Sequence, residues 1–406
     1  MVVFAHTPPP HHGQSAMVKL MLDLLARPAE LTPARPNAQA TRPLRLYHVN
    51  ARLSREMGDV GEPRFGKLPF LFKYCLQAIA LRLRHAASVF YYVPAPPART
   101  PLWRDLFVMA ACRPFFPKLV LHWHAGGLAE WLEQEGRPWE KRLARRFLGK
   151  ADLSLVLRPF NRHDADYFAA RRTELVCNGI PDPCPDFERT LQPHRLASAT
   201  ARRQVLQAPP PAKEAETART GARLFRVLYL SMCRREKGLF DTLEAIALAN
   251  ASRPNQPLRL ELTVAGDFWS PADRAEFDRR IQAPDLIRGT PLVRHVGFAS
   301  GAAKDELLRA SDCLSFPSYL PEGFPLILAE AMAYGLPLVT TTWRQLPEIL
   351  PPGYPGVVEP RAPAQLADKL LELAGRDYDP RLRAHFTANY TVERFGARLR
   401  EVLENL

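Results

Sequence analysis

The sequence has 406 residues, of which 47% are hydrophobic and 24% charged, a composition that is ordinary for a globular enzyme. A chain of this length exceeds one ordinary core, so we expect two domains. No apolar run reaches the roughly 18–20 residues of a membrane-spanning helix, and the start lacks the basic segment of a signal peptide. Six scattered cysteines without CxxC spacing argue against a zinc site or a disulfide framework and favour a reducing cytoplasm.

The net charge of +13 is unevenly distributed along the chain. Residues 1–150 hold 22 Lys and Arg against 10 Asp and Glu, a net charge of +12. Residues 301–406 hold 11 against 14, a net charge of −3. A basic first half indicates either a polyanionic or membrane partner or an Arg-rich genome composition. Only the first of these explains the asymmetry.

Short apolar runs alternate with helical patterns in the first half of the chain. We expect strands at residues 2–5, 44–49, 89–93, 118–122 and 151–157, and a helix at residues 15–26. This alternation predicts a parallel, doubly wound sheet. Residues 1–182 are therefore assigned to a first Rossmann-like domain.

Residues 183–222 are rich in Pro, Ala, Arg and Thr and show little periodicity, so they are interpreted as a linker. Order resumes in a second α/β domain at residues 223–385. Its expected strands lie at residues 225–230, 258–265, 293–297, 313–316 and 338–340, and its expected helices at 239–250 and 301–310. A last amphipathic helix is expected at residues 392–403. Two such domains predict a ligand cleft at the carboxyl ends of both sheets.

One segment of the second domain combines two glutamates with a helix start. Glu322 and Glu330 stand eight positions apart, and a helix beginning near Pro325 would leave the N–H groups of Leu326 and Ile327 free to bind an anion. A phosphate site between two carboxylates suits a nucleotide sugar, which has phosphates in the middle and hydroxyls at both ends. The alternative is an ordinary strand–turn–helix with two surface glutamates.

Several segments together resemble the retaining, metal-independent glycosyltransferases of family 4, which have the GT-B fold of two facing Rossmann-like domains. The similar segments are residues 7–15, 122–127, 177–182, 235–238, 310–348 and 390–395. The resemblance thus extends over nearly the whole chain outside the linker, and its segment at 310–348 is the most specific. It implies that residues 386–406 cross back to the first domain.

The resemblance also implies roles for individual residues. Glu330 would accept hydrogen bonds from the ribose hydroxyls, Glu322 would face the donor sugar, and Lys237 would neutralise the diphosphate leaving group. Backbone and side chains around the sugar and phosphates would come from Gly323, Phe324, Pro325, Leu326 and Ile327. From the first domain, His124 would approach the donor sugar.

Gly13 and Gln14 would bring the first loop close to the sugar and the diphosphate. One position departs from the family pattern: where the family has Gly-Arg, this chain has Ser231 and Met232. Met232 cannot bind phosphate, so Arg234 or Arg235 would substitute for the missing arginine, or Lys237 would act with backbone amides only.

The expected partners are a nucleotide-diphosphate sugar as donor and a saccharide or lipid-linked acceptor of the cell envelope. No metal and no other cofactor is expected, because no Asp-x-Asp stands in a donor-site setting. Basic residues stand together with aromatic or aliphatic residues at 64–74, 81–84, 103–107 and 113–118, which suits peripheral contact with an anionic membrane face. Core helices flanked by ordinary surface charge would have a similar sequence. The alternatives are a GT-B nucleotide-sugar epimerase and a non-enzymatic polyanion-binding protein; no motif indicates nucleic-acid binding.

Overall fold

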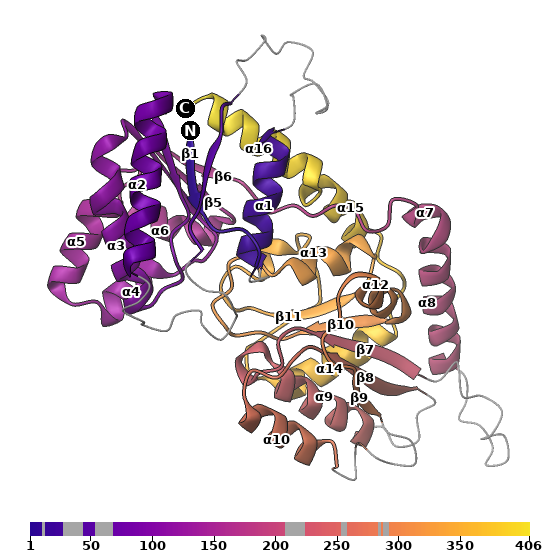
Figure 1. The fold of residues 1–406 in the computed structure, drawn as a ribbon. Coiled ribbons are helices and arrows are strands. Elements are labelled where there is room, and N and C mark those ends of the chain that lie inside the picture. Colours follow the sequence, from indigo (N-terminus) through magenta and orange to yellow (C-terminus); the bar gives the residue numbers. More distant parts are fainter. Residues whose placement is uncertain are drawn as a thin grey trace. The chain divides into compact units, whose positions relative to one another are not determined.

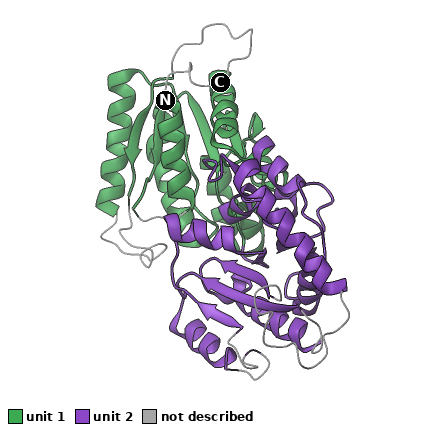
Figure 2. Cartoon of the chain, turned by 90° about the vertical axis from the view of Figure 1, so that its right-hand side faces the viewer, with its two compact units in different colours: residues 1–179, 321–325, 389–406 green, residues 180–320, 326–388 purple. Residues whose placement is uncertain are grey.

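The computed structural model describes residues 1–9, 13–26, 44–52, 68–207, 224–252, 258–282, 286 and 292–406. The chain divides into two compact units, which are coloured separately in Figure 2. Unit 1 comprises residues 1–179, 321–325 and 389–406, and unit 2 comprises residues 180–320 and 326–388. Unit 1 is thus built from segments that are far apart in the sequence, whereas the two segments of unit 2 are separated only by residues 321–325.

Unit 1 is organised around a six-stranded parallel sheet with the strand order β2-β1-β3-β4-β5-β6. The strands are β1 (Val2–Ala5), β2 (Tyr47–Asn50), β3 (Val89–Tyr92), β4 (Lys118–Trp123), β5 (Leu153–Val156) and β6 (Thr173–Leu175). The central strands β1, β3, β4 and β5 consist mainly of buried apolar residues, as strands covered on both faces must. The predicted parallel sheet of the first half is confirmed.

Helices cover both faces of this sheet (Figure 1). On one face lie α2 (Leu68–His85), α3 (Arg99–Cys112) and α5 (Pro138–Leu148), and on the other α1 (Gly13–Ala26) and α16 (Val392–Glu404). The shorter helices α4 (Leu128–Glu135) and α6 (Arg162–Tyr167) pack against each other. The core lies between these layers and includes the stacked rings of Trp123 and Phe168, whose centroids are 5.5 Å apart.

The C-terminal helix α16 belongs to unit 1 although it follows unit 2 in the sequence. The Thr391 side chain caps its first turn by accepting a hydrogen bond from the Arg394 N–H at 3.4 Å. Phe395, Leu399 and Val402 are buried, as their spacing predicts. Arg398 forms an ion pair with Glu174 of β6 at 2.6 Å, which ties the helix to the edge of the sheet.

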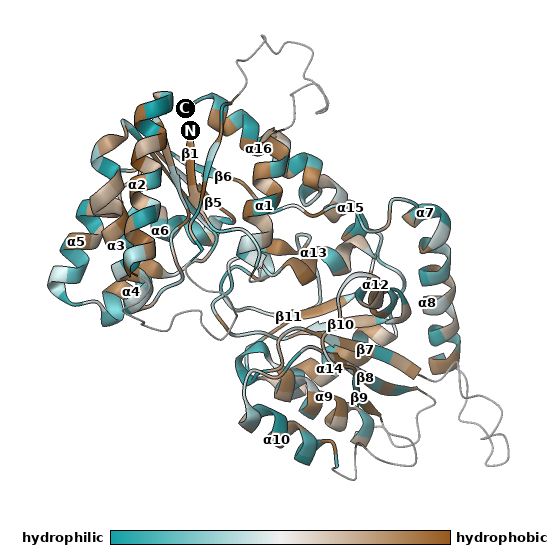
Figure 3. Ribbon diagram, viewed as in Figure 1, coloured by the Kyte–Doolittle hydropathy of each residue, from teal (hydrophilic) through white to brown (hydrophobic). Residues whose placement is uncertain are grey.

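Unit 2 contains a second six-stranded parallel sheet, with the order β12-β11-β10-β7-β8-β9. Its strands are β7 (Leu224–Leu230), β8 (Arg259–Ala265), β9 (Val293–His295), β10 (Cys313–Phe316), β11 (Leu338–Thr341) and β12 (Val357–Val358). Its helices include α7 (Phe187–Thr190), α8 (Gln192–Gln207), α9 (Leu239–Ala251), α10 (Pro271–Arg280), α12 (Gly301–Ala310), α13 (Leu326–Ala333), α14 (Pro363–Ala374) and α15 (Arg381–Asn389). In Figure 3 the strands β7, β10 and β11 are brown, whereas α10 is largely teal. Apolar strands at the centre and polar helices outside are what a doubly wound sheet requires.

The sequence predicts a linker at residues 183–222, but residues 192–207 form helix α8. Its arginines fix it to unit 2: buried Arg195 donates to the carbonyls of Leu308 and Tyr334, the first at 2.8 Å, and Arg202 pairs with Asp312 at 2.7 Å. The rest of the expected linker, residues 208–222, lies outside the described residues. Within the described ranges, no helix is long and apolar enough to cross a membrane.

Candidate active site

Lys237 lies at the carboxyl end of the sheet of unit 2, directly after β7. It ends the short 3₁₀ helix Arg235–Lys237, and its ammonium nitrogen lies 5.5 Å from the centre of the Phe316 ring at the end of β10. Gly238 follows with a positive φ of 78°, and a Cβ there would lie 2.4 Å from the carbonyl oxygen of Pro317. Only glycine therefore allows this turn to approach the end of β10 so closely.

Backbone hydrogen bonds hold the Lys237 turn against the segment that follows β10. The Tyr319 N–H donates to the carbonyl oxygen of Glu236 at 2.9 Å. Thr242, at the start of α9, shares a hydrogen bond of 2.9 Å with the hydroxyl of Ser315. These contacts give the Lys237 backbone a fixed position at the end of the sheet, as a residue that binds a leaving group needs.

The two arginines proposed as substitutes at the Met232 position are both paired with carboxylates. Arg234 donates to Glu236 at 2.8 Å and lies 4.9 Å from the centre of the Trp269 ring. Arg235 forms an ion pair with Glu276 of α10. Either arginine would have to give up its carboxylate to reach a phosphate.

Glu330 lies on α13 and forms an ion pair with Lys304 of α12. The ammonium of Lys304 donates to one Glu330 carboxylate oxygen at 2.6 Å, and the Glu330 side chain is 17% exposed. Tyr334, the first residue after α13, donates a hydrogen bond from its hydroxyl to Asp305 of the same α12. Two side-chain contacts thus align α12 with α13. Sequence reasoning missed Lys304, because nothing in its neighbourhood marks it and its partner lies 26 positions away.

Helix α13 begins at Leu326, one residue after Pro325, as the sequence predicts. Ile327 is buried and Leu326 partly exposed. A helix start leaves its first backbone N–H groups without intrahelical acceptors, so both residues offer amide donors to an anion. The described structure thus brings Lys237 and the start of α13 to the carboxyl end of one sheet.

His124 follows β4 at the carboxyl end of the sheet of unit 1. Its side chain is nearly buried, and its ring centre lies 4.0 Å from that of the fully buried His122. The Nδ1 atom of His122 shares a short hydrogen bond with the hydroxyl of Tyr91. Burial lowers the pKa of His124 to about 4 and the pKa of His122 well below its usual range. Near neutral pH both imidazoles are therefore uncharged.

The loop after His124 is fixed by Asp164 of α6. Its carboxylate accepts hydrogen bonds from the N–H groups of Gly127 at 2.8 Å and Ala129 at 2.7 Å, at the start of α4. A carboxylate at this place also complements the positive end of the helix dipole. Gly127 adopts a positive φ of 98° that allows the chain to turn into α4. His124 thus stands on a strand end whose following turn is rigid.

Residues 321–325 belong to unit 1 by their contacts, although the sequence analysis assigns them to the second domain. A Cβ atom on Gly323 would lie 1.6 Å from the carbonyl oxygen of His124. The Phe324 ring packs edge-on against Tyr390, with centroids 5.3 Å apart. Glu322, which is half-buried, directly precedes this contact in the chain. The structure therefore brings the Glu322 turn and the His124 backbone together.

Gly13 opens α1, and the half-buried Gln14 follows it. A Cβ on Gly13 would meet no described atom within 4 Å, so packing does not require glycine here. His11 and His12 of the same loop lie outside the described residues. The close approach to a ligand that is expected for Gly13 stays a prediction.

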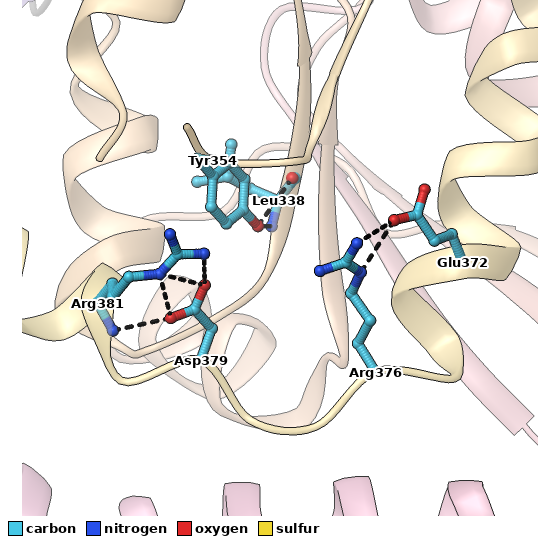
Figure 4. A network of polar contacts seen from close by, with 6 residues as sticks. All are labelled: Leu338, Tyr354, Glu372, Arg376, Asp379 and Arg381. Carbon is cyan, nitrogen blue, oxygen red and sulfur yellow. Dashed lines mark hydrogen bonds and ion pairs between the residues drawn. The ribbon is translucent and has the colours of Figure 1, made fainter. Parts of the chain in front are cut away.

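A separate cavity of about 470 Å³ lies at the opposite, amino end of the sheet of unit 2. Its lining includes Asp312 and Pro337, which directly precede β10 and β11. Figure 4 shows polar contacts at this cavity: Arg381 binds Asp379, with one bond of 2.7 Å, Arg376 binds Glu372 at 2.9 Å, and the Tyr354 hydroxyl bonds the backbone of Leu338. This cavity is distinct from the end of the sheet that carries Lys237. In the described part of the chain, no cluster of three or more His, Cys, Asp or Glu is arranged for a metal ion.

Comparison with known structures shows the class of this fold. The sucrose-phosphate synthase of Thermosynechococcus elongatus superposes with a TM-score of 0.63 at 18% identity, over 100% of this chain and 98% of that one. The Anabaena protein HepE, in complex with UDP-glucose, gives 0.62 at 18% identity, over 100% and 99%. A UDP-forming trehalose-phosphate synthase of Burkholderia xenovorans gives 0.61 at 14% identity, over 99% and 98%. The expected GT-B fold is confirmed.

Residues 225–376 match the family of glycosyl transferases group 1. No match is found among curated protein sequences. The matched range lies in unit 2 except for residues 321–325, and it contains Lys237 and Glu330. The chain thus has the GT-B fold, and its residues 225–376 are similar to a group 1 glycosyltransferase domain, which supports a glycosyltransferase activity.

Proposed function

We propose that this chain is a retaining, metal-independent glycosyltransferase of family 4 that uses a nucleotide-diphosphate sugar. One observation carries the proposal: Lys237 and the N-terminus of α13, with Glu330 on that helix, are held at the carboxyl end of one parallel sheet within a group 1 glycosyltransferase domain. Cationic and amide donors near a ribose-binding carboxylate are the groups that a nucleoside diphosphate needs. The HepE complex with UDP-glucose supports this class of donor.

In this proposal Lys237 and the amides of Leu326 and Ile327 stabilise the diphosphate as it departs. The bond from the sugar carbon to the phosphate oxygen breaks, and the positive charge that develops on the sugar is greatest in the transition state. Fixed positive groups on the leaving side therefore lower the barrier more than they stabilise the bound donor. The departing phosphate oxygen takes the proton of the acceptor hydroxyl, and the new bond forms on the same face.

The residues of unit 1 would act on the sugar itself. Neutral His124 can donate one hydrogen bond or accept one, so it orients a sugar hydroxyl without adding charge beside the cationic sugar carbon. Glu322 accepts hydrogen bonds from the hydroxyls on the far side of the sugar ring. Gly13 and Gln14 approach the diphosphate through the first loop. The acceptor we propose is a saccharide or lipid-linked saccharide of the cell envelope.

Thermal unfolding with UDP, GDP and ADP tests the donor site. One of these nucleotides should raise the unfolding temperature of the native chain, and Glu330→Ala and Lys237→Ala should abolish that increase. Glu306→Ala serves as the matched control, because Glu306 is an exposed residue of α12. No increase with any nucleotide, or equal increases in all four proteins, would contradict the proposed site.

The stereochemistry and the metal requirement are tested by slow hydrolysis of the identified donor. Retention predicts that proton NMR first detects the sugar anomer with the configuration of the donor. Excess EDTA should leave the rate unchanged. Initial release of the inverted anomer would contradict the retaining mechanism, and inactivation by EDTA that magnesium reverses would contradict metal independence.

A further inference from the structure

Helix α2 has an apolar stripe that the described part of unit 1 leaves exposed. Leu71, Cys75 and Ala78 form its buried side. A second set of apolar residues at helical spacing faces outward: Leu68, Phe72, Leu76 and Leu83 are 53%, 54%, 51% and 71% exposed. Single exposed apolar residues are normal on a folded protein, but four large apolar side chains along one line of a helix form a contiguous apolar patch.

The neighbouring helix α3 extends this exposed surface. Its Trp103 and Phe107, one turn apart, are exposed. The Trp103 ring lies 5.0 Å from that of Trp139, which α5 contributes. Phe115, just after α3, is exposed as well, and α2 packs against α3, as α3 does against α5. In Figure 1 these three helices lie on one face of the sheet of unit 1.

The charges that these helices expose to solvent have one sign. Helix α2 contains Lys73, Arg82, Arg84 and no acidic residue. The acidic residues of α3 and α5 are Asp105 and Glu140, and both are buried and paired: Arg104 lies 2.9 Å from Asp105 and Arg99 lies 3.0 Å from Glu140. Every acidic or basic side chain that α2, α3 and α5 expose to solvent is thus cationic.

We propose that the outer face of α2 and α3 docks on an anionic lipid bilayer. Large apolar side chains would enter the boundary between headgroups and acyl chains, while Lys73 and Arg84 would bind lipid phosphates. Helix α2 has 18 residues and is about 27 Å long, so it would lie along the bilayer surface. Positive charge alone would also suit a nucleic acid, but the apolar stripe gives no advantage there.

Two double substitutions separate the contribution of the apolar side chains to bilayer binding from the contribution of the positive charges. Phe72→Ser with Leu76→Ser removes the centre of the stripe, and Lys73→Gln with Arg84→Gln removes two charges at exposed positions. Removing one cation near an anionic surface weakens binding about fivefold, so the second pair should weaken it on the order of thirtyfold. The first pair should weaken it by at least about tenfold.

Co-sedimentation of the full chain with vesicles tests the proposal without any sugar donor, so its result is independent of the proposed transferase activity. We expect binding to phosphatidylcholine vesicles that contain phosphatidylglycerol, weaker binding to phosphatidylcholine alone, and release at high salt. Leu248→Ser on α9 and Arg279→Gln on α10, both at exposed positions of unit 2, are matched controls that should bind like the native chain.

Several outcomes would overturn the proposal. Absence of binding to the anionic vesicles would do so, as would binding that neither pair of α2 substitutions weakens. Light scattering in the absence of lipid tests the alternative that a second copy of this chain binds the same face. A native dimer that the α2 substitutions convert to a monomer, together with absence of vesicle binding, would indicate that alternative. Circular dichroism of both variants confirms that they are folded.

Discussion

At the scale of single residues, Gly323 has no room for a side chain. A Cβ there would overlap a backbone oxygen, that of His124, and a backbone atom cannot move aside as a flexible side chain would. We expect Gly323→Ala to destabilise the chain by about 1–3 kcal/mol, the usual range for overpacking, and to reduce activity. Gly13→Ala should leave the unfolding temperature unchanged, because nothing described lies near its Cβ. Equal unfolding temperatures for the two variants would contradict this contact.

The buried imidazole of His124 makes stability depend on pH. Its pKa falls from 6.5 in the unfolded chain to about 4 in the folded one. Between these two values the unfolded state binds the proton and the native state does not, so the free energy of unfolding increases with pH across this window and levels off above it. The whole shift corresponds to on the order of 3 kcal/mol.

Substitution of His124 by Gln should therefore flatten the dependence of the unfolding free energy on pH. The measurement is urea denaturation at a series of pH values between about 4 and 7, the range that spans the two pKa values of His124. His163→Gln is the control, because the His163 side chain is exposed on α6. Identical slopes for native chain and His124→Gln would show that His124 is accessible to protons in the folded state.

Lys304 is expected to be a positioning residue for Glu330. Its ion pair holds one carboxylate oxygen, and we expect the other to accept a hydrogen bond from a ribose hydroxyl. Lys304→Met should increase the KM for the donor about five- to tenfold and change kcat little, because the pair acts on binding in the ground state and the transition state alike. Lys369→Met removes a Lys–Glu pair of the same length on α14 and should leave the KM unchanged. An unchanged or lower KM in Lys304→Met would contradict this role.

At the scale of elements, helix α8 could not be predicted from the sequence, whereas the strands could. The strands could be predicted, because runs such as that of β1 are apolar throughout and need no distant partner to be recognised. Helix α8 carries buried arginines instead, and its anchors Leu308, Asp312 and Tyr334 lie more than 100 positions away. Its sequence is typical of an exposed linker until those carbonyl and carboxylate partners are known.

The contribution of these anchors to the free energy of unfolding can be measured by substituting two adjacent arginines, Arg202 and Arg203. Arg202→Met would leave the buried carboxylate of Asp312 without its cation, which costs about 3–5 kcal/mol in comparable buried pairs. Arg203→Met breaks an exposed ion pair with Asp377 and should cost less than about 1 kcal/mol. Chemical denaturation of the three proteins checks the difference. Equal costs would mean that α8 is not part of the stable structure of unit 2.

At the scale of the whole molecule, unit 1 is completed by two segments from the second half of the sequence, residues 321–325 and 389–406. Residues 321–325 were predicted as part of the donor segment, because of the spacing of Glu322 and Glu330, and that role stays a prediction. Their place in unit 1 could not be predicted, because it depends on the fit between Gly323 and a carbonyl about 200 positions earlier. Local patterns report periodicity and turn chemistry, but they contain no information on which distant backbone a glycine meets.

The same discontinuity predicts that two phenylalanines close together in the sequence stabilise different units. Phe386 is buried in α15 of unit 2 and Phe395 is buried in α16 of unit 1. Truncation of either to Ala should cost about 3–5 kcal/mol through the lost contacts and the cavity. Because local opening follows the unit that is weakened, Phe395→Ala should speed hydrogen exchange in α1 and β6, and Phe386→Ala should speed it in α13 and α14. Mass spectrometry of exchanged peptides distinguishes the two patterns. If both substitutions accelerate exchange uniformly over the chain, the two units unfold as one, and the division of the chain at residue 389 has no energetic counterpart.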